Sequence, residues 1–130
     1  TERVKALTDG KGVPVVYDSV GKDTFEASLD CLQPRGLMVS FGNASGAVPP
    51  FSPGMLAAKG SLYLTRPTLA TYTATRKELE DTTAELFDVV TSGAVKIEVN
   101  QTYALEYAAQ AHRDLEARRT TGSTVLIAGL

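Results

Sequence analysis

The sequence is poor in the residues that build metal and redox sites. Its 130 residues contain one cysteine, Cys31, and one histidine, His112. A disulfide within the chain is therefore impossible, and a structural zinc site made of Cys and His alone is excluded because it needs four such ligands. Sparse cysteine is typical of a reducing compartment, so we expect a cytoplasmic protein.

Charge of one sign and long apolar runs are also missing. The formal net charge is −2, which gives no electrostatic basis for binding nucleic acid or an anionic membrane surface. No run of 18 apolar residues occurs, so we expect no membrane-spanning helix. The first residues, TERVKALTDGKG, lack the apolar core of a signal peptide. They begin without methionine inside a helical pattern, so we expect a piece of a longer protein.

The hydrophobic residues that are present follow two alternating periods. Apolar runs predict strands at 13–20, 37–41, 61–65, 95–99 and 123–128. Between them, stripes with helical spacing predict helices, two of which begin with the form of a capping box, Asp23-Thr-Phe-Glu26 and Thr75-Arg-Lys-Glu78. We assign Asp23 to the N-cap of the first of these helices and assign no role to Asp18.

The order of these elements predicts an α/β fold with a doubly wound parallel sheet. Residues 13–41 have the strand–helix–strand pattern of a βαβ unit, so 13–17, 37–41 and 61–65 should be neighbouring parallel strands. The dinucleotide fingerprint G-x-G-x-x-G occurs nowhere in the chain. The loop VSFGNASG leads to Pro49-Pro50, so no helix N-terminus follows it to receive a phosphate.

Three stretches resemble one enzyme family: VVYDSVGKDTFEASLDCLQPRGLMVSFGNASGAV, KGSLYLTRPTL and LEARRTTGSTVLI. They are similar to the quinone oxidoreductases, the zinc-free, NADPH-dependent branch of the medium-chain dehydrogenase/reductase superfamily. The resemblance implies a carboxyl-terminal fragment. Residues 1–94 would be the second half of a Rossmann-like domain, and 95–130 a return segment toward an absent GroES-like catalytic domain. It also implies hydride transfer from NADPH to a quinone or another α,β-unsaturated carbonyl acceptor, and a homodimer formed through the 61–65 strand.

The candidate cofactor residues follow the predicted strands. Open parallel sheets bind ligands outside the carboxyl ends of their strands. The resemblance implies that the loop Phe41-Gly-Asn-Ala-Ser-Gly46 borders the nicotinamide, and that the loop Asp18-Ser-Val-Gly21 does so too. The candidates in these loops are Ser19, Gly21, Phe41, Gly42, Asn43 and Ser45. The alternative is that both loops are ordinary solvent-facing turns.

Three further candidates lie outside these loops. Leu64 and Thr65 follow the outer strand, where the resemblance implies backbone contacts with the nicotinamide carboxamide; the alternative is edge-strand structure or a dimer contact. Arg118 precedes Arg119-Thr-Thr-Gly122 and matches the family arginine that contacts the cofactor phosphates. A guanidinium fork fits phosphate oxygens in two-point fashion. The alternative for Arg118 is a basic helix C-terminus that complements the helix dipole.

No catalytic side chain is named from the sequence. We interpret His112 as structural or exposed and Cys31 as a small packing residue, because neither has a catalytic partner nearby in sequence. We expect no metal site. Two functions remain: part of an NADPH:quinone oxidoreductase, or a non-catalytic folded module whose outer strand mediates self-association. The natural electron acceptor and the choice of NADPH over NADH stay open, since the 2′-phosphate readers would lie outside this half.

Overall fold

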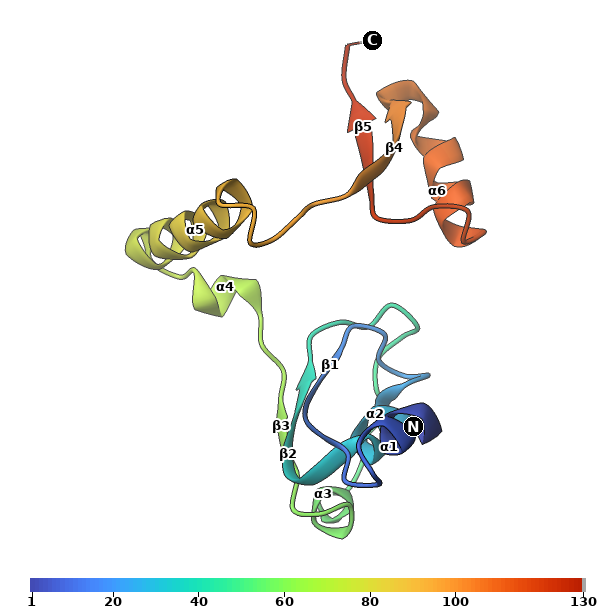
Figure 1. Cartoon of the computed structure of the whole chain (residues 1–130), viewed down its shortest axis with the longest axis vertical. Coiled ribbons are helices and arrows are strands. Elements are labelled where there is room, and N and C mark those ends of the chain that lie inside the picture. The colour runs from blue at the N-terminus through green and yellow to red at the C-terminus, as the bar shows by residue number, and fades with distance from the viewer. Residues whose placement is uncertain (130) are drawn as a thin grey trace. The chain divides into compact units, whose positions relative to one another are not determined.

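The chain folds into two compact units, Thr1–Thr75 and Arg76–Leu130. The structure is a computed structural model that describes residues 1–129 (Figure 1). Each unit has its own small parallel sheet. The domain division expected after residue 94 stays a prediction.

The first unit is built on a three-stranded parallel sheet in the order β1-β2-β3. The strands are β1 (Val13–Asp18), β2 (Leu32–Ser40) and β3 (Tyr63–Thr65). Val16 pairs with Met38, which pairs with Leu64, so these three side chains share one face of the sheet. The expectation of neighbouring parallel strands at 13–17, 37–41 and 61–65 is confirmed.

The core of this unit lies on that face, under α2 (Phe25–Asp30) and α3 (Gly54–Ala58). The Phe25 and Phe51 rings pack with their centroids 5.1 Å apart. Two short helices, α1 (Glu2–Leu7) and α4 (Leu69–Tyr72), flank the sheet in sequence. The buried cluster consists of Phe25, Leu29, Leu32, Met38 and Leu62.

Two local predictions for this unit are wrong. Strand β2 begins at Leu32, five residues before the predicted start, and the ladder is irregular between Val13 and Val15. Pro34 and Gly36 lie within this irregular stretch, where Arg35 has a φ of 62°. The chain can stay in the sheet here because the extra residues are bulged out of the pairing.

The capping box at residue 23 is also wrong. The N-cap of α2 is Thr24, and it makes no side-chain cap hydrogen bond. Its hydroxyl donates instead to the Asp18 carboxylate, at 2.7 Å, so the start of this helix is held by a residue of β1. Helix α5 does begin directly after Thr75, where the second box predicted it.

The second unit contains α5 (Arg76–Thr91), β4 (Val99–Ala104), the short 3₁₀ turn η1 (Leu105–Tyr107), α6 (Ala108–Glu116) and β5 (Ser123–Ile127). Strands β4 and β5 pair in parallel. The strand predicted at 95–99 is wrong in position. The Val95 N–H donates back to the Val89 carbonyl and extends the end of α5, and pairing with β5 begins only at Val99.

Helix α6 is joined to β4 by a polar contact. The Tyr103 hydroxyl donates to the Asp114 carboxylate, at 3.0 Å, and the Gln110 amide donates to the other oxygen. Hydrogen bonds from Gln110 and Tyr103 lower the pKa of Asp114, and the bond to Asp114 raises the pKa of Tyr103. Among the apolar residues of α6, Ala111 is buried, whereas Leu115 is 59% exposed.

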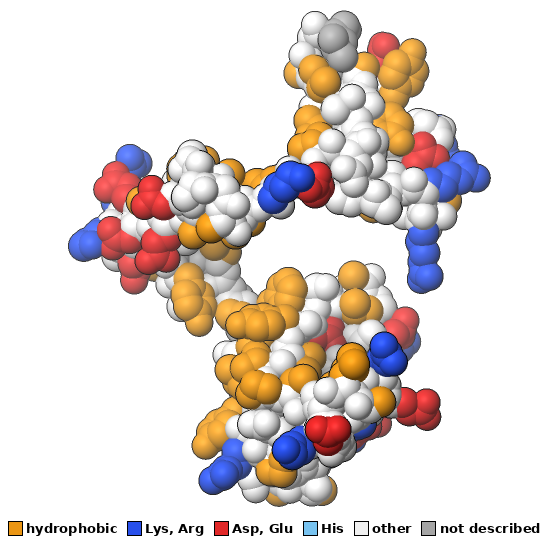
Figure 2. Space-filling model, viewed as in Figure 1, with side chains coloured by type: hydrophobic (Ala, Val, Ile, Leu, Met, Phe, Trp, Pro, Cys, Tyr) orange, Lys and Arg blue, Asp and Glu red, His pale blue; other side chains and the backbone are white. Residues whose placement is uncertain are grey.

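Large hydrophobic side chains lie at the surface of both units (Figure 2). In the first unit Tyr17 and Tyr63 are 74% and 62% exposed on the sheet face opposite the core. In the second unit Leu86 and Phe87 of α5 are more than half exposed. Within residues 1–129, no helix combines the length and the apolar character needed to cross a membrane.

Candidate functional site

The loops that follow β1 and β2 are hydrogen-bonded to each other along their length. Their strands pair up to Asp18 and Ser40. Beyond that point the backbone bonds continue between the loops, as Phe41 N–H to Asp18 O (2.8 Å), Ala44 N–H to Ser19 O (3.2 Å), Ser45 N–H to Val20 O (2.8 Å) and Lys22 N–H to Gly46 O (3.1 Å). The two loops therefore form one ordered floor at the carboxyl ends of the strands. We call residues 18–22 and 41–46 the paired loops.

Gly42 lies where the paired loops approach most closely. A Cβ at this position would be 2.3 Å from the Ser19 carbonyl oxygen and 2.8 Å from its Cα. Gly21 has a φ of +88°, and a Cβ there would be 2.6 Å from the Gly46 carbonyl oxygen. Contact between the loops is thus a sufficient reason for both glycines, and a flat ring approaching the backbone is not needed to explain them.

Ser45 and Asn43 differ in what their side chains already bind. The Ser45 hydroxyl donates to the Val20 carbonyl, at 2.8 Å, and accepts from the Asp23 N–H, at 3.0 Å, so it serves the loop contact. The Asn43 side chain is exposed and makes no hydrogen bond within the described part of the chain. Asn43 is therefore the side chain of the paired loops best suited to bind a polar ligand group.

A pocket opens beside Asn43 between the second loop and β3. It has a volume of about 260 Å³, the size of part of a ligand rather than a whole dinucleotide. Leu64 contributes to it from β3, with the Arg66 side chain at its rim, whereas Thr65 does not line it. The remaining walls are Phe25, Ser40, Ala47, Val48 and Phe51.

Asp18 is the residue that sequence reasoning missed. Its carboxylate is buried, at 4% exposure, and accepts from the N–H groups of Val20 and Gly21 and from the hydroxyls of Thr24 and Ser28. Burial alone raises the pKa of Asp18, but these four hydrogen bonds outweigh it and the pKa is lowered. The spacing of Thr and Ser at six and ten residues after an aspartate that ends a strand was the available signal.

The structure brings most sequence candidates to one sheet edge, but not all. Ser19, Gly21, Phe41, Gly42, Asn43 and Ser45 belong to the paired loops, and Thr65 pairs with Val39 on the adjacent strand. Arg118 belongs to the other unit. It lies in the turn after α6 with a φ of 56°, its guanidinium is exposed, and it makes no ion pair within residues 1–129.

Comparison with known proteins identifies the family. Residues 1–126 match the family model described as zinc-binding dehydrogenase. The chain belongs to the zinc-binding dehydrogenase family. Its resemblance to quinone oxidoreductases is confirmed by a quinone oxidoreductase of Pseudomonas aeruginosa, 61% identical over 96% of this chain. A 2-haloacrylate reductase of a Burkholderia species is 46% identical over 97% of the chain.

A solved relative carries a cofactor. The crystal structure of Escherichia coli quinone oxidoreductase complexed with NADPH is 55% identical, has a TM-score of 0.86 and matches 97% of this chain. This likeness confirms the Rossmann-like α/β fold class. The chain spans 38% of the Pseudomonas and Burkholderia relatives and 40% of the Escherichia coli structure.

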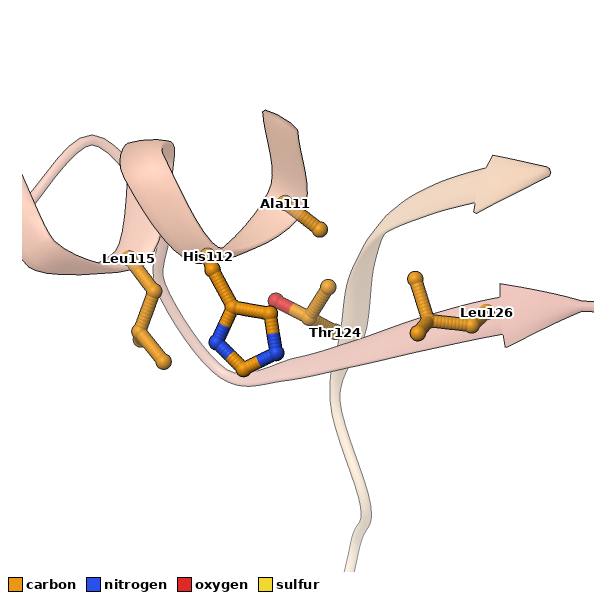
Figure 3. A pocket seen from close by; sticks show the side chains of 5 residues that line it. All are labelled: Ala111, His112, Leu115, Thr124 and Leu126. Atoms are coloured by element: carbon orange, nitrogen blue, oxygen red, sulfur yellow. The ribbon is translucent and has the colours of Figure 1, made fainter. Parts of the chain in front are cut away.

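The family description mentions zinc, but the described residues offer no cluster for it. Among residues 1–129 no group of three or more His, Cys, Asp and Glu side chains could hold a metal ion. His112 instead lines an open pocket between α6 and β5 with Ala111, Leu115, Thr124 and Leu126 (Figure 3). No carboxylate, cysteine or second histidine lines this pocket, so nothing there forms an acid/base pair with His112. That the dehydrogenase works without zinc stays a prediction.

Proposed function

We propose that this chain is the carboxyl-terminal part of an NADPH-dependent quinone oxidoreductase, here called the full-length protein. The observation that carries the proposal is the likeness of 97% of the chain to an NADPH-bound quinone oxidoreductase at 55% identity. The lengths of the relatives support a longer parent, because the chain spans about two fifths of each.

The paired loops and β3 form one wall of the cofactor site in this proposal. The Asn43 amide donates to or accepts from the nicotinamide carboxamide, and backbone groups of Leu64 and Thr65 reach the same group from β3. Phe41, 50% exposed, gives the ring an apolar surface. The paired loops are held in place by contacts among four of their residues, Ser19, Gly21, Gly42 and Ser45, and this is their main role in the proposal.

Arg118 binds the cofactor phosphates in this proposal. Its guanidinium has no carboxylate partner within the described residues, which leaves its donors available for an anion. A guanidinium binds phosphate oxygens through two parallel N–H donors. The helix-terminus alternative remains as an outcome of the Arg118 experiment in the Discussion.

The chemistry of such a site is supplied by the cofactor, and the protein positions it and excludes water. Bound NADPH supplies a hydride; a quinone that takes up this hydride and one proton becomes a hydroquinone. No side chain of this chain is assigned the proton transfer. The second candidate acceptor is a carbon–carbon double bond conjugated to a carbonyl group, which the likeness to a 2-haloacrylate reductase favours.

Self-association through β3 is part of the same proposal. Strand β3 pairs with β2 on one side only, so its other edge has backbone groups that can pair with a second copy. We also propose a cytoplasmic location, from the cysteine content.

The test uses the purified full-length protein. We expect NADPH to bind with a measurable Kd by fluorescence titration, and to be oxidised on addition of 1,4-benzoquinone. Asn43→Ala should raise the Kd about tenfold. Asn100→Ala is the control: this exposed residue of β4 donates to the Thr121 hydroxyl, and its loss should leave the Kd unchanged. If wild-type protein binds no NADPH, the proposal is wrong; 2-haloacrylate turned over faster than the quinone would favour the second acceptor.

A further inference from the structure

The two oxygens of the buried Asp18 carboxylate bind two different parts of the first unit. Oδ1 accepts from the N–H groups of Val20 and Gly21, at 2.8 and 2.9 Å. Oδ2 accepts from the hydroxyls of Thr24 and Ser28, both at 2.7 Å. One oxygen therefore holds the loop after β1, and the other holds helix α2.

The loop side of this contact continues into the candidate cofactor site. Val20, whose N–H is held by Oδ1, offers its carbonyl to the Ser45 N–H and hydroxyl, both at 2.8 Å. Gly21, also held by Oδ1, lies against the backbone of Gly46 and Asn43. The second loop is thus bonded to the first, and one carboxylate oxygen holds two N–H groups of the first loop.

The helix side connects the carboxylate to the buried core. Ser28 and Thr24 carry hydroxyls of the α2 region, and Leu29 beside them is part of the buried core. Removing the hydroxyl bonds should therefore weaken the packing of α2 without changing which N–H groups hold the loop. The two oxygens of Asp18 can be tested separately for this reason.

We propose that Asp18 is a positioning residue for the nicotinamide wall, acting through Oδ1 on Val20 and Gly21 and from there on Asn43 and Ser45. This rests on the proposed function for its effect on cofactor binding, but not for its effect on loop order. Asp18 makes no contact with cofactor in this assignment. A carboxylate suits the position because charge-assisted bonds to backbone N–H groups are stronger than neutral ones.

The alternative is that Asp18 only stabilises the fold. An unpaired buried donor is costly, so any loss of the carboxylate lowers stability whether or not the loops direct a ligand. A fall in melting temperature therefore does not distinguish the two readings. The readouts that do are the order of the loops without cofactor, the NADPH Kd, and rescue by a variant that keeps the Oδ1 acceptor.

The experiment compares Asp18→Ala, Asp18→Asn and the double variant Thr24→Val/Ser28→Ala in the full-length protein. Asparagine keeps an oxygen that can accept from Val20 and Gly21, whereas alanine does not. The double variant removes the Oδ2 bonds and a 3.5 Å bond from the Thr24 hydroxyl to the Gly21 carbonyl, which keeps its bonds from the Thr24 and Phe25 N–H groups. Amide hydrogen exchange on the cofactor-free protein reports loop order. Fluorescence titration with NADPH reports affinity, and thermal unfolding reports stability.

We expect Asp18→Ala to speed exchange at residues 18–22 and 41–46 and to raise the NADPH Kd about tenfold or more. Asp18→Asn should bring the Kd back to within about threefold of wild type. The double variant should lower the melting temperature while leaving loop exchange and Kd unchanged. The inference is overturned if Asp18→Ala leaves loop exchange at the wild-type rate. It is also overturned if the double variant shows the same loop exchange and the same NADPH Kd as Asp18→Ala.

Failure of the proposed function would look different from failure of this inference. If the wild-type protein binds no NADPH, the function is wrong, and faster loop exchange in Asp18→Ala alone still supports the positioning of the loops. If the wild type binds NADPH and Asp18→Ala binds it equally well, the function stands and Asp18 has no positioning role.

Discussion

Gly42 carries no side chain because the neighbouring loop occupies the space. Even a methyl group would lie 2.3 Å from the Ser19 carbonyl oxygen, a backbone atom that can move only if the paired loops separate. Overpacking of this kind costs about 1–3 kcal/mol. We predict that Gly42→Ala lowers the free energy of unfolding of the full-length protein by that amount in urea, and Gly42→Val by more.

Gly54 provides the control for this prediction. It begins α3, and a Cβ there would meet only the Ser52 hydroxyl, at 3.4 Å. Gly54→Ala should therefore be neutral or stabilising by up to about 1 kcal/mol. Weaker NADPH binding in a Gly42→Ala protein of unchanged stability would instead favour direct contact between Gly42 and the ring.

Arg118 occupies a backbone conformation that suits glycine better. Its φ of 56° lies in the left-handed region, which costs an L-residue about 1–2 kcal/mol. Arg118→Gly should therefore stabilise the turn after α6 by up to about 1 kcal/mol, measured by urea unfolding. If the guanidinium binds phosphate, the same variant should raise the KM for NADPH, and Arg118→Lys should restore part of the loss. Greater stability with an unchanged KM would show that Arg118 is a basic residue at the helix end and not a phosphate ligand.

At the scale of elements, the hydrogen bonds that connect Asp18 of β1 to the start of α2 should stabilise the fold in a pH-dependent way. Burial raises the pKa of Asp18, but its hydrogen bonds lower the pKa by more, so that it lies below its usual range. The stabilisation is therefore complete above the ordinary aspartate pKa, near 4, and is lost as the pH falls through the folded-state value. We predict that Asp18→Asn makes the loss of unfolding free energy between about pH 5 and 3 shallower than in wild type.

Asp114 must be separated from this effect. Its pKa is also lowered, by the Gln110 and Tyr103 hydrogen bonds, so it contributes a slope of the same sign from the other unit. Asp114→Asn is the matched control, and the two variants should change the pH profile independently. Superimposable profiles for Asp18→Asn and wild type would show that Asp18 is not linked to folding in this range.

Strand β3 is the edge of the first unit's sheet, and a charge on it should oppose pairing with a second copy. Lysine on edge strands is a common device against such pairing. We predict that Tyr63→Lys reduces the dimer fraction of the full-length protein in sedimentation velocity. Tyr72→Lys is the control, since Tyr72 is similarly exposed (64% against 62%) but lies in α4. Equal dimer fractions in all three proteins would place any interface elsewhere.

Sequence periodicity predicted most of the elements but misplaced one strand whose side chains are half exposed. The strands at 13–17 and 37–41 were found because Val16 and Met38 must face the core. The strand at 95–99 was misplaced because Val95 and Ile97 are about half exposed, so alternation alone fixed no pairing. The role of Asp18 depends on hydroxyls six and ten residues away, which only the turn brings together.

The sequence predicted that the candidate residues would group at one sheet edge, but not the contacts that they make. Strand ends in a parallel sheet lie at one edge, which was enough to group Asn43 with Ser19. Sequence could not show that the Ser45 hydroxyl is already bonded to Val20, or that Gly42 faces Ser19 and not a ligand. Those facts depend on the pairing of two loops more than 20 residues apart.

At the scale of the whole molecule, the chain exposes many large apolar side chains. Both units contribute: Tyr17 and Tyr63 from the first sheet, and Leu86 and Phe87 from α5 in the second unit. Contiguous apolar patches on soluble proteins mark surfaces that another protein segment covers. The 60% or so of each relative that lies outside the match is long enough to supply that cover.

The 130 residues alone should therefore not act as a reductase. They contain no G-x-G-x-x-G turn to hold the pyrophosphate, and the paired loops form only one wall of the proposed nicotinamide site. Binding must still overcome several kcal/mol of lost translational and rotational freedom, and the contacts of one wall are too few to offset this cost. We predict no NADPH oxidation with 1,4-benzoquinone above the protein-free rate, and self-association by light scattering through the uncovered surfaces. The full-length protein, assayed at the same molar concentration, is the positive control. Turnover by a monodisperse 13.8 kDa species would show that this chain holds a complete site, and would contradict its assignment as part of a longer enzyme.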